Sequence, residues 1–277
     1  MKGVFCSSGT MVGRANGYNY TLILKNFPSL FEKGLISGGE FIVLNAYYEN
    51  IRKICKEVKS TGVPFDVLHC DKDIGIMLSE HDDKITEKAL TLLKRNCEVA
   101  SELGCTRMVF HLWGAPKSDS AIEYNISLIP KVLKITDDAK IHLMIENIPC
   151  TTASGLENWR KLYKYLPRLS FVFDTRFGAF HDETEKILNE PIWEHINHMH
   201  ISDYGAAPRD FSKIRPILHP GEGKIDFGYI FSRLAKNGYE GTFTLESPVM
   251  TPSGVDIPKL EKSLSYLNGI AKKYGLL

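Results

Sequence analysis

The sequence lacks a surplus of either charge. Its 34 basic residues are balanced by 33 acidic ones, which leaves a formal net charge of +1 over 277 residues. Proteins dedicated to nucleic acid usually carry a basic excess or a basic stripe, so this balance disfavours a nucleic-acid partner. No apolar run reaches the roughly 18 residues that cross a bilayer, and the first ten residues, MKGVFCSSGT, are too short an apolar stretch for a signal peptide. We therefore expect no membrane partner and a cytoplasmic location.

Cysteine is scarce and has no regular spacing. The six cysteines include no pair spaced as C-x-x-C, so we expect free thiols, many of them in the core, rather than a disulfide framework. The turn G-x-G-x-x-G is also missing after the first apolar run. Because that turn marks doubly wound sheets that bind dinucleotides, its absence disfavours such a sheet.

Short apolar runs rich in β-forming residues recur along the chain, and most are followed by a stretch with helical periodicity. Nearly continuous apolar strands that alternate with helices are typical of a parallel sheet covered by helices. Eight such units in 277 residues favour a closed barrel, a fold that takes about 250 residues. We therefore predict an α/β protein, a single (β/α)8 TIM barrel formed by one domain over residues 1–277. The strands are expected at 3–6, 40–45, 64–69, 106–111, 141–146, 169–174, 195–201 and 241–246, and the helices at 48–60, 85–103, 122–136, 156–165, 227–237 and 257–274.

Acidic residues and histidines end most of the expected strands. In a barrel these ends converge on one face, where the active sites of this fold lie. Singly, a histidine at a strand end is more often a structural hydrogen-bonding residue, and an aspartate there more often caps the next helix. A carboxylate within an apolar strand is costly to bury, however, unless it is paired or bound to a metal, and the set together offers the mixed nitrogen and oxygen ligands that Zn²⁺ and Mn²⁺ accept. The residues at the strand ends are His69, His111, Glu146, Asp174 and Glu246, with His200 one residue before the end of its strand.

Six segments, in their order and spacing, resemble the xylose isomerase-like barrels. This family includes sugar-phosphate isomerases and epimerases and the deoxyribonuclease IV type of AP endonuclease. The segments are residues 100–114 (ASELGCTRMVFHLWG), 145–149 (IENIP), 171–175 (FVFDT), 198–203 (HMHISD), 219–227 (HPGEGKIDF) and 243–247 (FTLES). The resemblance implies a small-molecule sugar substrate and leaves a homo-oligomer possible. It also implies one divalent ion, Zn²⁺ or Mn²⁺, held by Glu146, Asp174, His200 and Glu246.

In the isomerase and epimerase branch, the metal acts as a Lewis acid on a keto-sugar, and protons are transferred through an enediolate. The resemblance implies that Glu146 and Glu246 transfer these protons while they also contact the metal. His198 is expected deeper in its strand, as a buried interior residue or a partner of the ligands. A structural role stays open for each further pocket residue. These are His69 and His111 for sugar hydroxyls, Trp113 for stacking, Asn147 for orienting the metal site, Arg209 for a phosphate or carboxylate, and Glu222 in a loop.

The chain departs from the family in two places. The family commonly has Asp-x-x-His after the sixth strand, and here the histidine position is Phe177, which cannot bind a metal; His181 is a weaker substitute. The endonuclease branch, which the histidines ending strands three and four would suit, also expects Asp-x-His after strand seven. Here His219 is preceded by Arg215 and Ile217, and the aspartate is missing. A zinc-dependent AP endonuclease is therefore the second hypothesis, and a non-catalytic sugar-binding barrel is the third.

Overall fold

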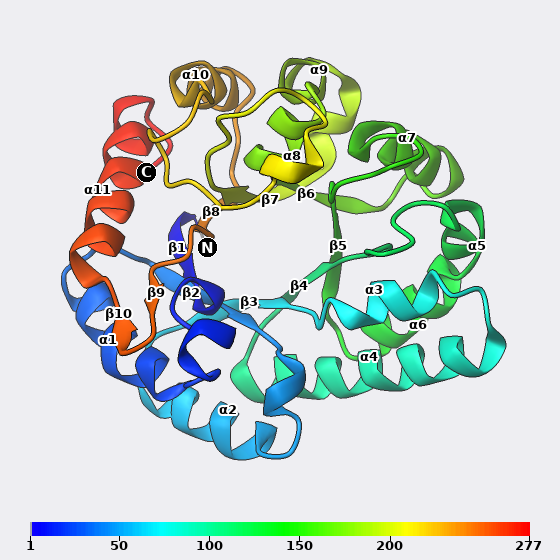
Figure 1. The fold of residues 1–277 in the computed structure, drawn as a ribbon, viewed down its shortest axis with the longest axis horizontal. Helices are drawn as coiled ribbons and strands as arrows, with labels where there is room; N and C mark the ends of the chain where they lie inside the picture. Colours follow the sequence, from blue (N-terminus) through cyan, green and yellow to red (C-terminus); the bar gives the residue numbers. More distant parts are fainter. Residues whose placement is uncertain (1) are drawn as a thin grey trace.

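The computed structural model describes residues 2–277 and shows a closed barrel of eight parallel strands ringed by helices (Figure 1). Successive strands pair in chain order, and β8 pairs with β1 to close the ring. The predicted (β/α)8 class is confirmed. The strands are β1 (Gly3–Ser7), β2 (Gly38–Ile42), β3 (Phe65–His69), β4 (Arg107–Phe110), β5 (His142–Glu146), β6 (Ser170–Asp174), β7 (Ile196–Ile201) and β8 (Thr242–Leu245).

Helices cover the outside of the barrel between successive strands (Figure 1). One of them, α1 (Thr21–Glu32), has no counterpart among the expected helices and contains Pro28. The expected helix at 122–136 is two helices, because the helix is interrupted at Leu128, just before Pro130. Within residues 2–277, no helix is both long and apolar enough to span a membrane. The other elements are α2 (Ile51–Ser60), α3 (Asp73–Leu78), α4 (Asp83–Leu103), α5 (Ile122–Ser127), α6 (Ile129–Asp138), α7 (Gly155–Tyr165), α8 (Thr175–Phe180), α9 (Thr184–Asn189), α10 (Phe227–Lys236), α11 (Ile257–Lys273) and the hairpin of β9 (Met250–Thr251) and β10 (Gly254–Val255).

Side chains alternate along each strand between the barrel interior and the surrounding helices, because successive residues of a strand point to opposite faces. On β6, Phe171 and Phe173 point outward into the main core, while Val172 points inward. The inward residues form a small apolar cluster of their own, made of Phe5, Val67, Val109, Met144 and Val172. Two residues further along β3 to β6, the same inward face carries His69, His111, Glu146 and Asp174.

Strand β2 lies earlier in the chain than predicted, at Gly38–Ile42 instead of 40–45. Glycine weakens the sequence signal of a strand, but here it permits close packing. A Cβ atom on Gly39 would lie 2.4 Å from a ring carbon of Phe65 and 2.7 Å from one of Phe27. The shift puts Glu40 in the middle of the strand, fully buried inside the barrel and in register with Val67 of β3.

Candidate metal centre

The carboxyl ends of β5 to β8 bring four acidic and histidine side chains together at the mouth of the barrel. Each offers one oxygen or nitrogen atom, and these atoms all lie within 4.8 Å of one another. Three of the four side chains are buried, and that of Glu246, just after β8, is 13% exposed. The structure thus gathers the whole predicted ligand set of Glu146, Asp174, His200 and Glu246.

His200 lies at the centre of this cluster. Its Nδ1 atom is 3.0 Å from Glu146 Oε1 and 3.3 Å from Glu246 Oε2, and its Nε2 atom is 3.0 Å from Glu40 Oε2. Burial alone would lower the pKa of His200, but the charges of Glu246, Glu40 and Glu146 raise it well above its usual value. In the metal-free chain His200 is therefore the cation that holds the carboxylates together.

Asp174 divides its two oxygens between a helix cap and the cluster. Oδ1 accepts a hydrogen bond from the Phe177 backbone N–H at 3.0 Å, at the start of α8. Oδ2 is buried and has no hydrogen-bond partner within residues 2–277. Burial, opposed by Arg176 and reinforced by Glu146 and Glu246, raises the pKa of Asp174 to about 7. An unpaired, buried carboxylate oxygen beside other carboxylates fits a divalent cation, which would stabilise its charged form.

His69 and His111 lie side by side against Glu146. His111 Nε2 is 2.6 Å from Glu146 Oε2, and burial lowers the pKa of His111 to about 4, so a neutral ring donates to the carboxylate. His69 Nδ1 is 2.9 Å from the Cys70 carbonyl and donates to it. The other nitrogen, Nε2, is buried 3.5 Å from Glu146 Oε2 and has no hydrogen-bond partner in the described chain. This pair therefore adjoins the four-residue cluster and offers it another nitrogen ligand.

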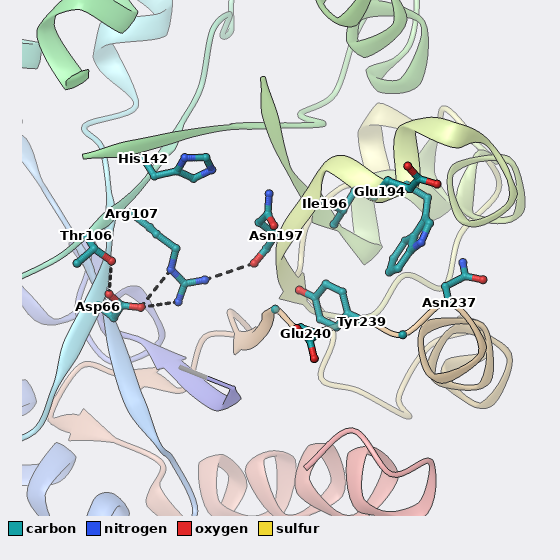
Figure 2. A pocket seen from close by; sticks show the side chains of 13 residues that line it. Asp66, Thr106, Arg107, His142, Glu194, Ile196, Asn197, Asn237, Tyr239 and Glu240 are labelled. Carbon is teal, nitrogen blue, oxygen red and sulfur yellow. Dashed lines mark hydrogen bonds and ion pairs between the residues drawn. The ribbon is translucent and has the colours of Figure 1, made fainter. Parts of the chain in front are cut away.

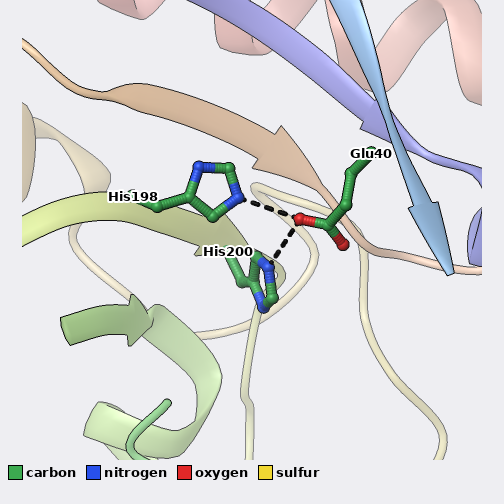
Figure 3. A group of neighbouring side chains, drawn as sticks. All are labelled: Glu40, His198 and His200. Carbon is green, nitrogen blue, oxygen red and sulfur yellow. Dashed lines mark hydrogen bonds and ion pairs between the residues drawn. The ribbon is translucent and has the colours of Figure 1, made fainter. Parts of the chain in front are cut away.

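Glu40 is a member of the site that the sequence prediction missed. From the middle of β2, its Oε2 atom accepts hydrogen bonds from His198 Nε2 at 2.9 Å and from His200 Nε2 at 3.0 Å (Figure 3). His198 is fully buried one layer deeper than His200, and its Nδ1 atom contacts Thr242 Oγ1 at 2.6 Å, so its predicted position is confirmed. A carboxylate within an apolar strand is the sequence signal that could have identified Glu40. The predicted strand of 40–45 placed Glu40 at its first position instead of in its middle, so this signal was not seen.

Asn147 contacts the backbone of Asp174, whereas Trp113 is packed inside the protein. The Asn147 side chain accepts from the Asp174 backbone N–H at 2.7 Å and donates to the Asp174 carbonyl at 3.2 Å, so it anchors the strand end that carries Asp174. Trp113 is fully buried. Residues 111–114 lie against α3, where the His111 and Trp113 carbonyls pack against Gly75. The stacking of Trp113 on a sugar stays a prediction.

Arg209, Glu222 and His181 contact other parts of the chain rather than the four-residue cluster. Arg209 donates to the Ala153 carbonyl at 2.8 Å, and Glu222 accepts from the His219 backbone N–H at 3.0 Å and pairs with Lys259 at 3.2 Å. The structure therefore does not bring Arg209 or Glu222 into contact with the four-residue cluster. His181 is likewise engaged elsewhere, because its Nε2 atom accepts from the Cys150 backbone N–H at 3.0 Å.

Asp203 orders the long loop that follows β7. Its carboxylate accepts hydrogen bonds from the backbone N–H groups of Tyr204, Gly221, Gly223 and Ile225 at 2.8–3.1 Å. A Cβ atom on Gly223 would lie 2.4 Å from Asp203 Oδ1, so glycine is required there. The segment HPGEGKIDF thus folds around one buried carboxylate.

Arg176, two residues after Asp174, was also missed. The side chain is almost fully buried and lies over the Phe177 ring at 4.1 Å. Its Nη1 atom donates to the Ile214 carbonyl at 3.1 Å, and Nη2 lies 4.0 Å from Asp174 Oδ2. Nε is buried without a partner in the described part of the chain. A guanidinium with spare donors therefore lies next to the candidate metal centre, beside the position where the family has a histidine.

Comparisons with known proteins bear on the fold and the family. A sequence model of the family described as xylose isomerase-like TIM barrel matches residues 33–269. The chain is 22% identical over 172 residues to a putative L-ribulose-5-phosphate 3-epimerase of Haemophilus influenzae, a match that covers 60% of this chain and 59% of that protein. The match thus spans less than two thirds of that relative.

Two solved structures share the fold. One is the 3-keto-D-glucoside 4-epimerase YcjR from E. coli, with a TM-score of 0.70, 16% identity, and coverage of 97% of this chain and 100% of that one. The other is the IOLI protein with a bound zinc atom, with a TM-score of 0.70, 18% identity, and coverage of 100% and 97%. At these identities the likeness shows the fold alone.

Proposed function

The chain belongs to the family of xylose isomerase-like TIM barrels, and we infer that it is a divalent-metal-dependent isomerase or epimerase of a ketose or ketose phosphate. The observation that carries this proposal is the convergence of Glu146, Asp174, His200 and Glu246, with the unpaired Asp174 Oδ2 atom among them. Three carboxylates and one imidazole suit Zn²⁺ or Mn²⁺. The relatives named as epimerases, and the zinc in the IOLI structure, support the proposal.

The two glutamates are unequal as proton-transfer groups. Glu146 is buried, and both its oxygens lie against histidines, Oε1 against His200 and Oε2 against His111. Glu246 is partly exposed, and its Oε2 atom lies 3.3 Å from a single histidine nitrogen, His200 Nδ1. Glu246 is therefore the freer base to take a proton from a substrate carbon.

Glu146 would act from the other side of the mouth, because β6 and β7 separate β5 from β8 in the ring (Figure 1). Two acid–base groups that flank one carbon allow a proton to leave from one face and return to the other, which is epimerisation. A bound divalent ion would supply Lewis-acid polarisation of the keto group. His111, which donates to Glu146, keeps that carboxylate in place.

The proposed activity is tested with a panel of ketoses and ketose phosphates assayed with Mn²⁺, Co²⁺ and Zn²⁺. We expect conversion of at least one to its epimer or isomer, with solvent deuterium incorporated at the carbon that changes, and loss of conversion after metal removal. Cleavage of an abasic DNA duplex with three zinc ions per chain would replace this proposal with the phosphodiesterase. Absence of any bound metal, with sugar binding unaffected by Glu146→Gln, would favour the non-catalytic barrel.

Arg176 is our candidate for recognition of a substrate phosphate, in place of Arg209. A charge-assisted hydrogen bond contributes about 1.5–3 kcal/mol, so Arg176→Met should lower kcat/KM for a ketose phosphate by roughly 10- to 100-fold and leave the unphosphorylated ketose much less affected. Arg209→Met is the comparison, because Arg209 contacts the Ala153 carbonyl. If the phosphate-specific loss appears in Arg209→Met instead, the sequence-based assignment of Arg209 holds.

A further inference from the structure

Glu40 is buried inside the barrel, behind the candidate ligands. It comes from β2, whereas the four clustered residues come from β5 to β8, and its side chain is fully inaccessible to solvent. One oxygen, Oε2, accepts from both His198 and His200, and the other, Oε1, has no partner in the described chain (Figure 3). A buried carboxylate loses its hydration, which destabilises the folded state unless hydrogen bonds compensate for it. The burial of Glu40 therefore indicates that its contacts with the two histidines have a role.

The ring of His200 has two orientations that differ by a half-turn about the Cβ–Cγ bond. In the observed one, Nε2 lies 3.0 Å from Glu40 and Nδ1 faces Glu146 at 3.0 Å and Glu246 at 3.3 Å. A half-turn would put ring carbons where both nitrogens now lie. An acceptor at the Glu40 position therefore favours the one orientation in which a nitrogen faces the ligand cluster.

A directional series of hydrogen bonds fixes the proton positions behind His200. Arg107 can only donate, and its Nη1 atom lies 3.1 Å from Thr242 Oγ1. Because Thr242 accepts from Arg107, its own hydroxyl proton is free to go to His198 Nδ1 at 2.6 Å. His198 then carries its proton on Nε2, which donates to Glu40 and lies 3.1 Å from Thr244 Oγ1.

Glu40, as a carboxylate, accepts at the end of this series and requires a proton on His200 Nε2 as well. His200 is thereby left with Nδ1 as the nitrogen that can bind a metal. The series begins at the opposite end of the barrel, where Arg107 also pairs with Asp66 at 2.7 Å and contacts the Asn197 carbonyl, in a pocket lined by strand beginnings (Figure 2). The orientation of the ligand is thus set from within the barrel, before any ion arrives.

We propose that Glu40 is a positioning residue of the metal centre: it holds the His200 ring and its Nε2 proton so that Nδ1 is presented to the divalent ion. This role rests on the proposed metal-dependent function. Carboxylates that accept from a metal-bound histidine orient the ring and raise its basicity, and their loss typically weakens metal affinity by about 10- to 100-fold. His198 and Thr242 support Glu40 and do not themselves face the ligand cluster.

The test compares Zn²⁺ and Mn²⁺ affinities, measured by chelator competition, in the wild type, Glu40→Met and Glu40→Gln. Methionine fills the space without an acceptor, so it should weaken binding by about 10- to 100-fold. Glutamine keeps one acceptor oxygen and should lose much less. On a His200→Ala background, Glu40→Met should cause no further loss, because the two residues act through one interaction.

Asp119→Asn is the matched control, since Asp119 is equally buried but binds the backbone of residues 151–153. It should lower the free energy of unfolding and leave metal affinity unchanged. If Glu40→Met lowers only stability and retains the wild-type metal affinity, Glu40 is structural and the proposal is wrong. If the wild type binds neither Zn²⁺ nor Mn²⁺, the proposed metal centre is wrong, and so is the positioning role of Glu40. If metal binds without sugar conversion, the proposed function fails while the comparison of Glu40 variants still decides the role of Glu40.

Discussion

Replacement of Glu246 by glutamine should slow the exchange of solvent deuterium into a ketose substrate by about 10²- to 10⁴-fold, the contribution of a positioned general base. Glutamine has nearly the same shape and keeps an oxygen that can contact a metal, but it cannot accept a proton at neutral pH. Glu246 is the carboxylate with the greatest exposure in the cluster. We therefore expect metal binding to persist while proton transfer is lost.

Exchange is measured by NMR of the recovered sugar, and metal content is measured on the same samples. Glu240→Gln is a suitable control, because Glu240 lies on the surface before β8 and pairs with Lys2. Exchange at the wild-type rate in Glu246→Gln would show that Glu246 is not an essential proton-transfer group. Loss of both exchange and metal would assign it to binding alone.

The second large effect is expected from Asp174→Asn, read out as stability. A ligand that binds only the folded state at 1,000 times its dissociation constant stabilises it by about 4.1 kcal/mol. Wild-type protein should gain this amount from Zn²⁺ or Mn²⁺, and Asp174→Asn should gain almost nothing at the same concentration. The asparagine oxygen can still cap α8 at the Phe177 backbone N–H, so the fold should survive the change.

Without metal, the wild type and Asp174→Asn should differ in how their stability depends on pH. The pKa of Asp174 is raised to about 7 in the folded chain, so the folded state binds this proton more tightly than the unfolded state. Metal-free wild type should then lose stability as the pH rises from about 4 towards 7, a loss that Asp174→Asn lacks. Denaturant unfolding at pH 5 and pH 8 measures both effects. A metal-induced gain in Asp174→Asn equal to that of the wild type would contradict its assignment as a ligand.

The barrel and the end of it that carries the candidate metal centre could be predicted because strands and their ends leave a local signal. Runs such as LMIE and FVFD are apolar until their last residue, and parallel strands bring those last residues to one edge. Asp174 and His200, for example, are 26 positions apart in the chain and are partners in register. No long-range information was needed to expect them together.

The rest depended on contacts that a single sequence does not reveal. Glu40 follows two glycines, which weaken the sequence signal of its strand, and the packing of Phe27 and Phe65 over Gly39 is a long-range contact. Arg176 belongs to none of the sequence patterns from which the site was predicted. In the fold it is almost fully buried, with the Ile214 carbonyl and the Phe177 ring against its guanidinium group. Trp113 was expected to stack on a sugar, and the residues around it gave no sign of the full burial that the fold imposes on it.

Successive residues of each strand face opposite sides of the barrel wall, so they contact different parts of the protein. On β7, His198 and His200 face the interior while Met199 and Ile201 pack against the helices. The outward side chains of β7 pack the barrel against its helices, while the inward ones belong to the candidate metal centre and its hydrogen-bond partners. A single-residue insertion within β7 would exchange the two sets at once and remove stability and chemistry together. The candidate metal centre can therefore be altered by point substitutions in these strands but not by a change in their length.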